Sequence, residues 1–211
     1  MIDIKIKLKE MSKESNELTL SNQSVIMTEK ALSDAEKLIK SKLLPDAIKT
    51  PEQAVVIMQK GKELGFQPLQ AFDSIDVILG KATLKPKAKG ALARKTGKVW
   101  WRTVKDWEPI FDENGELIDY ETVLQGFRNY DGHITEDICK YTYSEAASMG
   151  LVGKDNWKRQ PKIMAYWRCL SRLLDRIAPD LTGGLYMSDE MADVAGIDYK
   201  LSEEGDFTVV E

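Results

Sequence analysis

The segments KVWWRTVKDW (residues 98–107), LIDYETVLQGFRNY (117–130) and HITEDICKYTY (133–143) decide the fold class. Each one is rich in β-branched and aromatic residues, which favour strands. The segments DENG (112–115) and DG (131–132), which connect them, are typical of tight turns. The sequence therefore predicts a meander of three antiparallel strands.

Shorter elements surround the meander. Residues 75–79 and 82–84 are mostly apolar and flank Gly80 and Lys81, a pair that suits the turn of a small hairpin. Apolar spacing and capping residues predict helices over about 28–42, 50–64, 68–72, 86–96, 144–149 and 161–177. We therefore expect an α+β fold, in which a small antiparallel β-sheet (the hairpin plus the meander) is packed with helices.

The chain is predicted to have three parts. Residues 1–27 are polar and are interpreted as an N-terminal arm, which contacts a neighbouring copy or moves freely. Residues 28–186 form the predicted core. From about Met187 the chain is acidic and poor in large apolar groups, so residues 187–211 are interpreted as a partly disordered tail.

The composition is that of a globular protein. Of the 211 residues, 43 % are hydrophobic and 30 % are charged, and no apolar run is long enough to span a membrane. The first residues alternate charged and apolar side chains and do not resemble a signal peptide. Cys139 and Cys169 are far apart in the sequence, and there is one histidine, so we expect no disulfide framework, no zinc site and a cytoplasmic location.

Charge lies in alternating blocks, although the net charge is only −4. Residues 77–105 contain nine Lys or Arg and no acid, and residues 154–176 contain seven basic residues and two acidic ones. Residues 106–145 contain eleven acids, and residues 180–211 contain nine. The basic blocks favour an anionic partner that the mean charge does not suggest.

Few residues suit catalysis. His133 stands alone beside a turn, and Cys139 and Cys169 have no base nearby in the sequence, so the two cysteines are interpreted as packing residues. The chain has no phosphate-binding loop for ATP. The acid-x-Lys triplets typical of metal-dependent nucleases occur only near the two ends. We therefore expect no catalytic residue, no cofactor and no dedicated metal site.

The helix predicted over residues 161–177 places Arg168, Arg172 and Arg176 on one face, opposite an apolar stripe. One interpretation is a solvated outer face. However, three guanidinium groups one turn apart repel one another unless an anion lies along them, and arginine binds phosphate with paired hydrogen bonds. The second interpretation is therefore contact with a nucleic-acid backbone.

Alternation along the first meander strand puts Lys98, Trp100 and Arg102 on one face and Val99 and Trp101 on the other. The second face is expected to belong to the core. The first places an aromatic ring between two cations, as a stacking surface for single-stranded bases requires. The alternative is that the two tryptophans simply cover both faces of the sheet.

Two other segments contain candidate phosphate contacts. A basic run without nearby acids precedes the meander, although such a run is more often a solvated face. Its candidates are Lys81, Lys85, Lys87, Lys89 and Arg94. Before the arginine helix, Trp157 is interpreted as a core anchor, and the candidates are Lys154, Asn156, Lys158, Arg159 and Lys162.

An ordered set of motifs extends over about residues 28–190. Its front half is GKELGFQPLQAF (61–72), Ile75 and Gly80-Lys81. Its back half is Gly150-Leu151, Lys154, Asn156-Trp157, Pro161, Met164, Arg168, Arg172, Pro179-Asp180, Gly183-Gly184 and Tyr186. Taken together, these motifs resemble the RecT family of phage and prophage recombinases.

The resemblance implies ATP-independent binding of single-stranded DNA and its annealing to a complementary strand, in phage-type homologous recombination within a bacterial host. It also implies a fold related to that of Red-beta, and rings or helical filaments that form on the nascent duplex, with DNA in a basic groove that runs across adjacent subunits. Mg²⁺ is expected at most to assist annealing, without a dedicated site. The implied partners are DNA, further copies of the chain, a host single-strand-binding protein and a companion phage exonuclease.

Two other functions remain open from the residues themselves. One is a metal-dependent phage nuclease that processes DNA, and the other is a non-catalytic module whose basic face binds an acidic protein. Cleavage of single strands with magnesium would favour the first. Binding that does not depend on strand length would favour the second.

Overall fold

The computed structural model describes residues 29–45 and 47–210, in a chain that divides into two units, residues 1–59 and 60–211. The first unit contains α2 (Glu29–Lys40) and the start of α3 (Pro51–Glu63). A capping box begins α3: the Gln53 backbone N–H donates to the Thr50 hydroxyl, and the Thr50 N–H donates to the Gln53 side chain, both at 3.3 Å. Both predicted helices are confirmed, and the box satisfies N–H groups at the start of α3.

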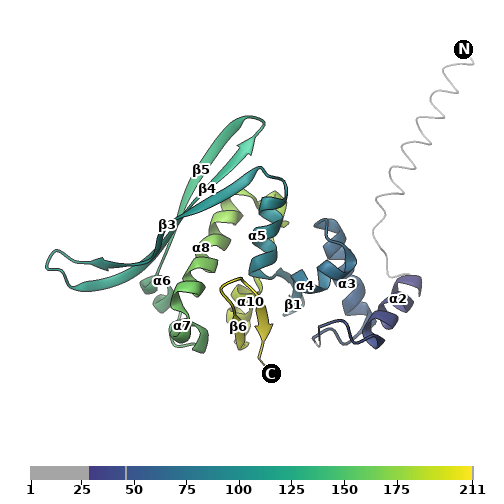
Figure 1. The fold of residues 1–211 in the computed structure, drawn as a ribbon. Helices are drawn as coiled ribbons and strands as arrows, with labels where there is room; N and C mark the ends of the chain where they lie inside the picture. Colours follow the sequence, from purple (N-terminus) through teal and green to yellow (C-terminus); the bar gives the residue numbers. More distant parts are fainter. Residues whose placement is uncertain (1–28, 46, 211) are drawn as a thin grey trace, which may run out of the picture. The chain divides into compact units, whose positions relative to one another are not determined.

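A three-stranded antiparallel sheet lies along one side of the second unit (Figure 1). Its strands are β3 (Val99–Phe111), β4 (Leu117–Tyr130) and β5 (His133–Thr142), in that order. The long helix α8 (Pro161–Ile177) packs along one face. Gly126 of β4 permits this close approach, because a Cβ there would lie 2.7 Å from Ile177 and 2.9 Å from Leu173. The predicted meander and long helix are confirmed.

Shorter elements complete the second unit. The predicted hairpin is β1 (Ile75–Ile78) with β2 (Lys81–Leu84), but its turn consists of Leu79 and Gly80, whose φ angles are 52° and 73°. Part of the loop expected before α8 is helical. The described chain is therefore α+β, with antiparallel sheets of two, three and two strands. The remaining elements are α4 (Pro68–Ser74), α5 (Pro86–Lys95), α6 (Tyr143–Ser148), α7 (Asp155–Arg159), α9 (Pro179–Thr182), α10 (Ser188–Ala195), β6 (Tyr199–Leu201) and β7 (Phe207–Val209).

The prediction of a partly disordered tail from about Met187 is wrong. This segment forms α10 and the hairpin of β6 and β7. Met187, Leu201 and Phe207 are buried in the same core as α8. Large apolar residues are few here, but these three reach the core, so the core extends beyond residue 186. The predicted arm, residues 1–27, lies outside the described residues.

β3 and β4 continue beyond β5 as a two-stranded ribbon (Figure 1). The register between them shifts at Thr103/Lys105 and again at Lys105/Glu108. Trp107 has a φ of 57°, and its ring stacks on Tyr120 with the centroids 5.4 Å apart. Irregularities of this kind bend a strand and increase its twist. They mark the place where the ribbon leaves the sheet.

Candidate nucleic-acid interface

β3 presents its two tryptophans to opposite sides of the sheet, as alternation predicts. Val99 is buried and Trp101 packs against the core, whereas Trp100 is 39 % exposed. Trp100 pairs across the strands with Phe127, and their rings are nearly parallel, with centroids 5.5 Å apart. The outer face of the sheet therefore presents two adjoining aromatic rings.

Two cations flank this aromatic pair. Arg102 is exposed, and its Nε donates to Oε1 of Gln125 at 2.9 Å. Lys98 Nζ lies 3.4 Å from the Asp131 carboxylate, and both side chains are mostly exposed, so this ion pair is weak. Both cations are therefore able to exchange their present partners for phosphate. We call Lys98, Trp100, Arg102 and Phe127 the aromatic platform.

Arg94 lies on the other side of β3. Its guanidinium carbon is 3.9 Å from the centroid of the Trp101 ring, in cation–π geometry. Trp101 is fixed in turn, because its Nε1 donates to the Tyr166 hydroxyl at 3.2 Å. Arg94 is exposed and stacks on an aromatic ring, so it places a positive charge on the side of β3 opposite the aromatic platform.

The prediction that Arg168 faces solvent and contacts phosphate is wrong. The residue is 5 % exposed, its Nε lies 3.1 Å from Asp189 Oδ2, and its Nη2 donates to the Asp193 carboxylate. Both acids lie on α10. Burial raises the pKa of Asp189 to about 6, against the opposing effect of the Arg168 charge. Arg168 therefore joins α10 to α8 within the core.

The prediction that Lys89 contacts phosphate is also wrong. Lys89 is fully buried, and its Nζ donates to Ser171 Oγ at 2.9 Å and lies 2.7 Å from the Asp175 carboxylate. Burial raises the pKa of Asp175, although Lys89 opposes this shift. α5 packs against α8 through this side chain, and the basic run does not reveal which of its lysines faces the neighbouring helix.

Arg172 and Arg176 remain partly exposed, but each is paired. Arg172 Nη1 lies 2.8 Å from Glu145 Oε1, and Arg176 Nε lies 2.8 Å from Asp137 Oδ2. Arg172 also lies 4.5 Å above the ring of Tyr141. Carboxylates from β5 and α6 therefore relieve the repulsion between these arginines. Phosphate binding by the two residues stays a prediction.

Interactions with α10 and β6 fix the segment that precedes α8. Trp157 is 3 % exposed, which confirms it as a core anchor. Lys154 Nζ lies 2.7 Å from Asp193, and Asn156 Nδ2 donates to the carbonyl oxygen of Tyr199. The positions of Lys154 and Asn156 are therefore explained by contacts within the fold.

The other cations of this segment lie at the surface. Arg159 pairs with Asp155 at 2.9 Å, and Lys162 pairs with Asp106 of β3 at 2.7 Å. Lys158 is exposed. Exposed pairs contribute little to stability, so these three residues remain candidates for phosphate contact.

A cleft beside α8 brings together residues from both basic blocks. It has a volume of about 450 Å³ and contains Lys81, Arg168 and Arg172. Tyr186, 57 % exposed, also lines it. Arg168 is already paired with acids, and Asp175 and Glu190 line the same cleft, so Lys81 and Arg172 remain its candidates for contact with an anion.

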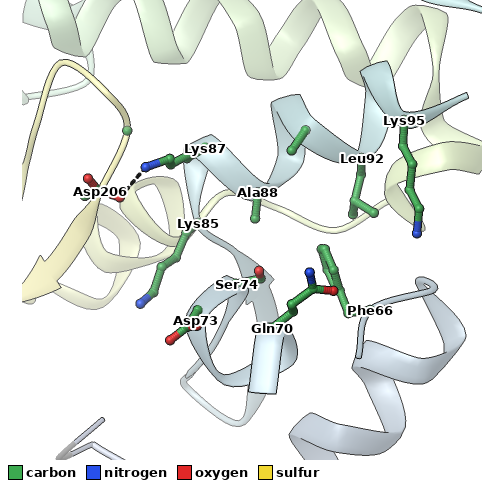
Figure 2. Close-up of a pocket in the computed structure, with 12 residues that line it drawn as sticks. Phe66, Gln70, Asp73, Ser74, Lys85, Lys87, Ala88, Leu92, Lys95 and Asp206 are labelled. Carbon is green, nitrogen blue, oxygen red and sulfur yellow. Dashed lines mark hydrogen bonds and ion pairs between the residues drawn. The ribbon is translucent and has the colours of Figure 1, made fainter. Parts of the chain in front are cut away.

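A groove of about 520 Å³, which α4 and α5 help to line, contains Lys85 and Lys87 of the basic run (Figure 2). Lys87 Nζ lies 3.3 Å from Asp206, and Lys85 Nζ lies 4.0 Å from Asp76. The groove does not include any residue of the aromatic platform. The predicted contacts are thus distributed over several surfaces.

Phe127 is the platform residue that sequence reasoning missed. Trp100 follows from alternation on β3, but its neighbour on β4 depends on the register of two strands that shift at three places. Alternation alone places Phe127 on the face opposite Gly126 and Arg128. That this is the outer face follows only from the contacts of Gly126 and Arg128 with α8 in the structure.

The residues considered for catalysis lie as expected. His133 is exposed, and Cys139 and Cys169 are buried free thiols, which confirms the cysteines as packing residues. Across residues 29–45 and 47–210, no three His, Cys, Asp or Glu side chains are grouped so that they could hold a metal ion. No helix in the same residues has the length and apolar character that crossing a membrane needs.

Comparison of the chain with family models, with curated proteins and with solved structures finds no match.

Proposed function

We propose that the protein binds single-stranded DNA and anneals it to a complementary strand without ATP, as an assembly of several copies. The observation that carries this proposal is the aromatic platform. Trp100 and Phe127 form a stacked pair on the outer face of the sheet, and Lys98 and Arg102 lie on the same face.

Stacking on the platform suits annealing in particular. Every base has an aromatic face, so a ring such as Trp100 binds bases without regard to sequence, for roughly 1–3 kcal/mol per base. A base that lies flat on this ring keeps its hydrogen-bonding edge free. A second strand is then able to pair with it while the first strand stays bound.

The cations of the platform hold the backbone. Arg102 exchanges Gln125 for phosphate at little cost, because the amide is neutral and the site is exposed. Candidates on other surfaces extend the contact to further phosphates: Arg94, Lys158, Arg159, Lys162 and Arg172. Arg176 adds less, because Asp137 already neutralises it. Each phosphate that is neutralised releases counterions, which favours binding at low salt.

The resemblance to RecT recombinases supports the same activity. A fold related to that of Red-beta, a role in phage-type recombination, and contacts with a host single-strand-binding protein and a phage exonuclease are part of this proposal. They rest on the motifs, whereas DNA binding rests also on the platform.

Binding of a fluorescent 30-nucleotide strand tests the platform, and transfer between labelled complementary strands tests annealing without ATP. Trp100→Ala is expected to weaken binding about 5- to 150-fold, the equivalent of roughly 1–3 kcal/mol. The matched control is Tyr143→Ala, which removes an aromatic ring that is 43 % exposed on α6, outside both the platform and the cleft beside α8.

Three outcomes would contradict the proposal. Equal affinities for wild type and Trp100→Ala would remove the platform from the site. Cleavage of the strand in magnesium would favour the nuclease. Affinity that is independent of strand length would favour the module that binds an acidic protein.

A further inference from the structure

The end of the β3–β4 ribbon is an exposed apolar surface with negative charge. Phe111, Leu117 and Ile118 are 56 %, 50 % and 59 % exposed. The turn that joins the strands contains Asp112, Glu113 and Glu116, and the sequence has no Lys or Arg between residues 105 and 128. Clustered exposed apolar side chains mark an interaction surface. We call these six residues the ribbon tip.

The ribbon tip has a defined conformation. Asp112 Oδ1 accepts hydrogen bonds from the backbone N–H groups of Asn114 and Glu116, both at 2.8 Å. These bonds lower the pKa of Asp112, so the carboxylate stays charged. A surface that is already ordered loses less conformational entropy when it binds.

The groove in Figure 2 has the complementary character. Phe66 lies opposite Leu92 of α5, and Ala88 and Ala91 also line the apolar part. Lys85, Lys87 and Lys95 belong to the same lining. Lys95 Nζ donates to the backbone carbonyl of Gly65 at 2.7 Å, so its charge is not neutralised by that partner.

Two carboxylates, those of Asp73 and Asp206, also line the groove. They do not prevent an acidic partner from binding there. Asp206 lies 3.3 Å from Lys87 in a pair whose side chains are both more than half exposed. Asp73 is exposed. Lys85 lies 4.0 Å from Asp76, so the cation available to an acidic partner is chiefly Lys95, whose partner is a backbone carbonyl. The groove therefore fits an apolar segment with an acidic flank. Its volume of about 520 Å³ accommodates more than one large side chain.

We propose that the ribbon tip of one copy docks in the groove of a second copy of this chain. Phe111, Leu117 and Ile118 enter the apolar part, and the acids of the turn lie near the lysines. Within one copy the ribbon and α4 lie on opposite sides of α8 (Figure 1), so the tip cannot fill its own groove. A contact between two different surfaces leads to head-to-tail arrays of copies.

This inference deepens the proposed function, because it names the contact that lines copies up along a DNA strand. It makes a separate claim, however, since the two surfaces are complementary without DNA. Assembly in the absence of DNA is therefore the property to measure, and DNA binding is measured apart from it.

Sedimentation velocity without DNA tests the contact. Phe111→Asp alters the tip and Ala91→Asp alters the groove, and both residues are exposed. Val194→Asp is the control, at a 75 % exposed apolar residue outside both surfaces. We expect the wild type and the control to assemble as concentration rises, and each of the other variants to remain monomeric at tenfold higher concentration. Circular dichroism checks that all of them fold.

Mixing the two monomeric variants gives the sharpest result. One copy retains an intact groove and the other an intact tip, so the mixture is expected to form dimers and nothing larger. A monomeric wild type, assembly of either variant alone, or a mixture that stays monomeric would each overturn the inference. So would an Ala91→Asp protein that assembles normally but binds single strands less tightly. If the wild type assembled but failed to bind single-stranded DNA, the proposed function would be refuted and this inference would stand.

Discussion

α8 and β3 both carry a row of basic residues, but the fold gives these rows different surroundings. Arg168 of α8 is buried between Asp189 and Asp193. Arg102 of β3 is exposed and bonded to the neutral amide of Gln125. The acids that pack against Arg168 lie on α10, 21 and 25 residues further along the chain. The presence or absence of acids close in the sequence therefore does not show whether a row of basic residues is available to a ligand. That depends on which segments pack against the row.

The largest effect is expected for Arg168→Ala, which should lower the free energy of unfolding by about 3–5 kcal/mol, because it leaves buried carboxylates without a partner. Urea denaturation measures this loss. The control is Arg172→Ala, whose half-exposed pair with Glu145 is worth at most about 1 kcal/mol. Equal midpoints for the two variants would show that the acids of α10 do not hold Arg168 more firmly than Glu145 holds Arg172.

The two tryptophans of β3 are expected to have separate roles, Trp101 in the stability of the fold and Trp100 in DNA binding. Trp101→Ala should cost about 3 kcal/mol of stability, because the ring packs on the core and holds Arg94 and Tyr166. Trp100→Ala should cost much less, since that ring is on the outer face. Thermal denaturation of both variants checks this, and a larger loss for Trp100→Ala would contradict the assigned strand register.

The buried carboxyl of Asp189 on α10 is expected to make the stability of the fold depend on pH, with an effect of intermediate size. Burial raises the pKa of Asp189 from 3.8 to about 6, so the folded state binds this proton more tightly than the unfolded state does. Stability from this group is present below pH 4 and is lost as pH rises toward about 6. Relative to Asp189→Asn, the wild type should therefore become less stable over that range.

Urea denaturation at several pH values between 4 and 7 measures this difference. If the stability of the wild type relative to Asp189→Asn instead increased with pH, the charge of Arg168 would outweigh the effect of burial, and the pKa of Asp189 would lie below its usual value.

The smallest expected effect concerns salt. Arg102→Ala should reduce the slope of log affinity against log salt by about 0.7 for single strands, because one phosphate contact is lost. Arg176→Ala should change it less, since Asp137 already neutralises that residue. Equal reductions in slope would mean that phosphate displaces Asp137 on binding.

Local patterns predict the elements of this fold well. Alternation, turn residues and the Thr50 capping box locate the meander and the start of α3, and α8 has the expected bounds. The C-terminal segment is misjudged because its core residues are spaced too widely for a local pattern. Met187 and Phe207 are recognised as core residues only through the packing of distant elements.

The candidate site was only partly predictable for the same reason. The opposite directions of Trp100 and Trp101 follow from strand geometry alone. The burial of Lys89 and Arg168 does not, because it depends on Ser171 across α5 and α8 and on the acids of α10. Helix periodicity shows which residues share a face, but not what packs against that face.

The irregular course of β3 also limits pairing of other chains with one edge of the sheet. Among the strands of the described residues, β3 is an outer strand of its sheet. The unpaired backbone groups of an outer strand can template fibril growth. Regular pairing with β4 runs only from Val99 to Thr103 before the shifts, and the positive φ of Trp107 interrupts the row again. These irregularities make the β3 edge a poor template for a foreign strand. Added pairing would therefore fall on β5, the other outer strand, which pairs regularly with β4 from His133 to Thr142.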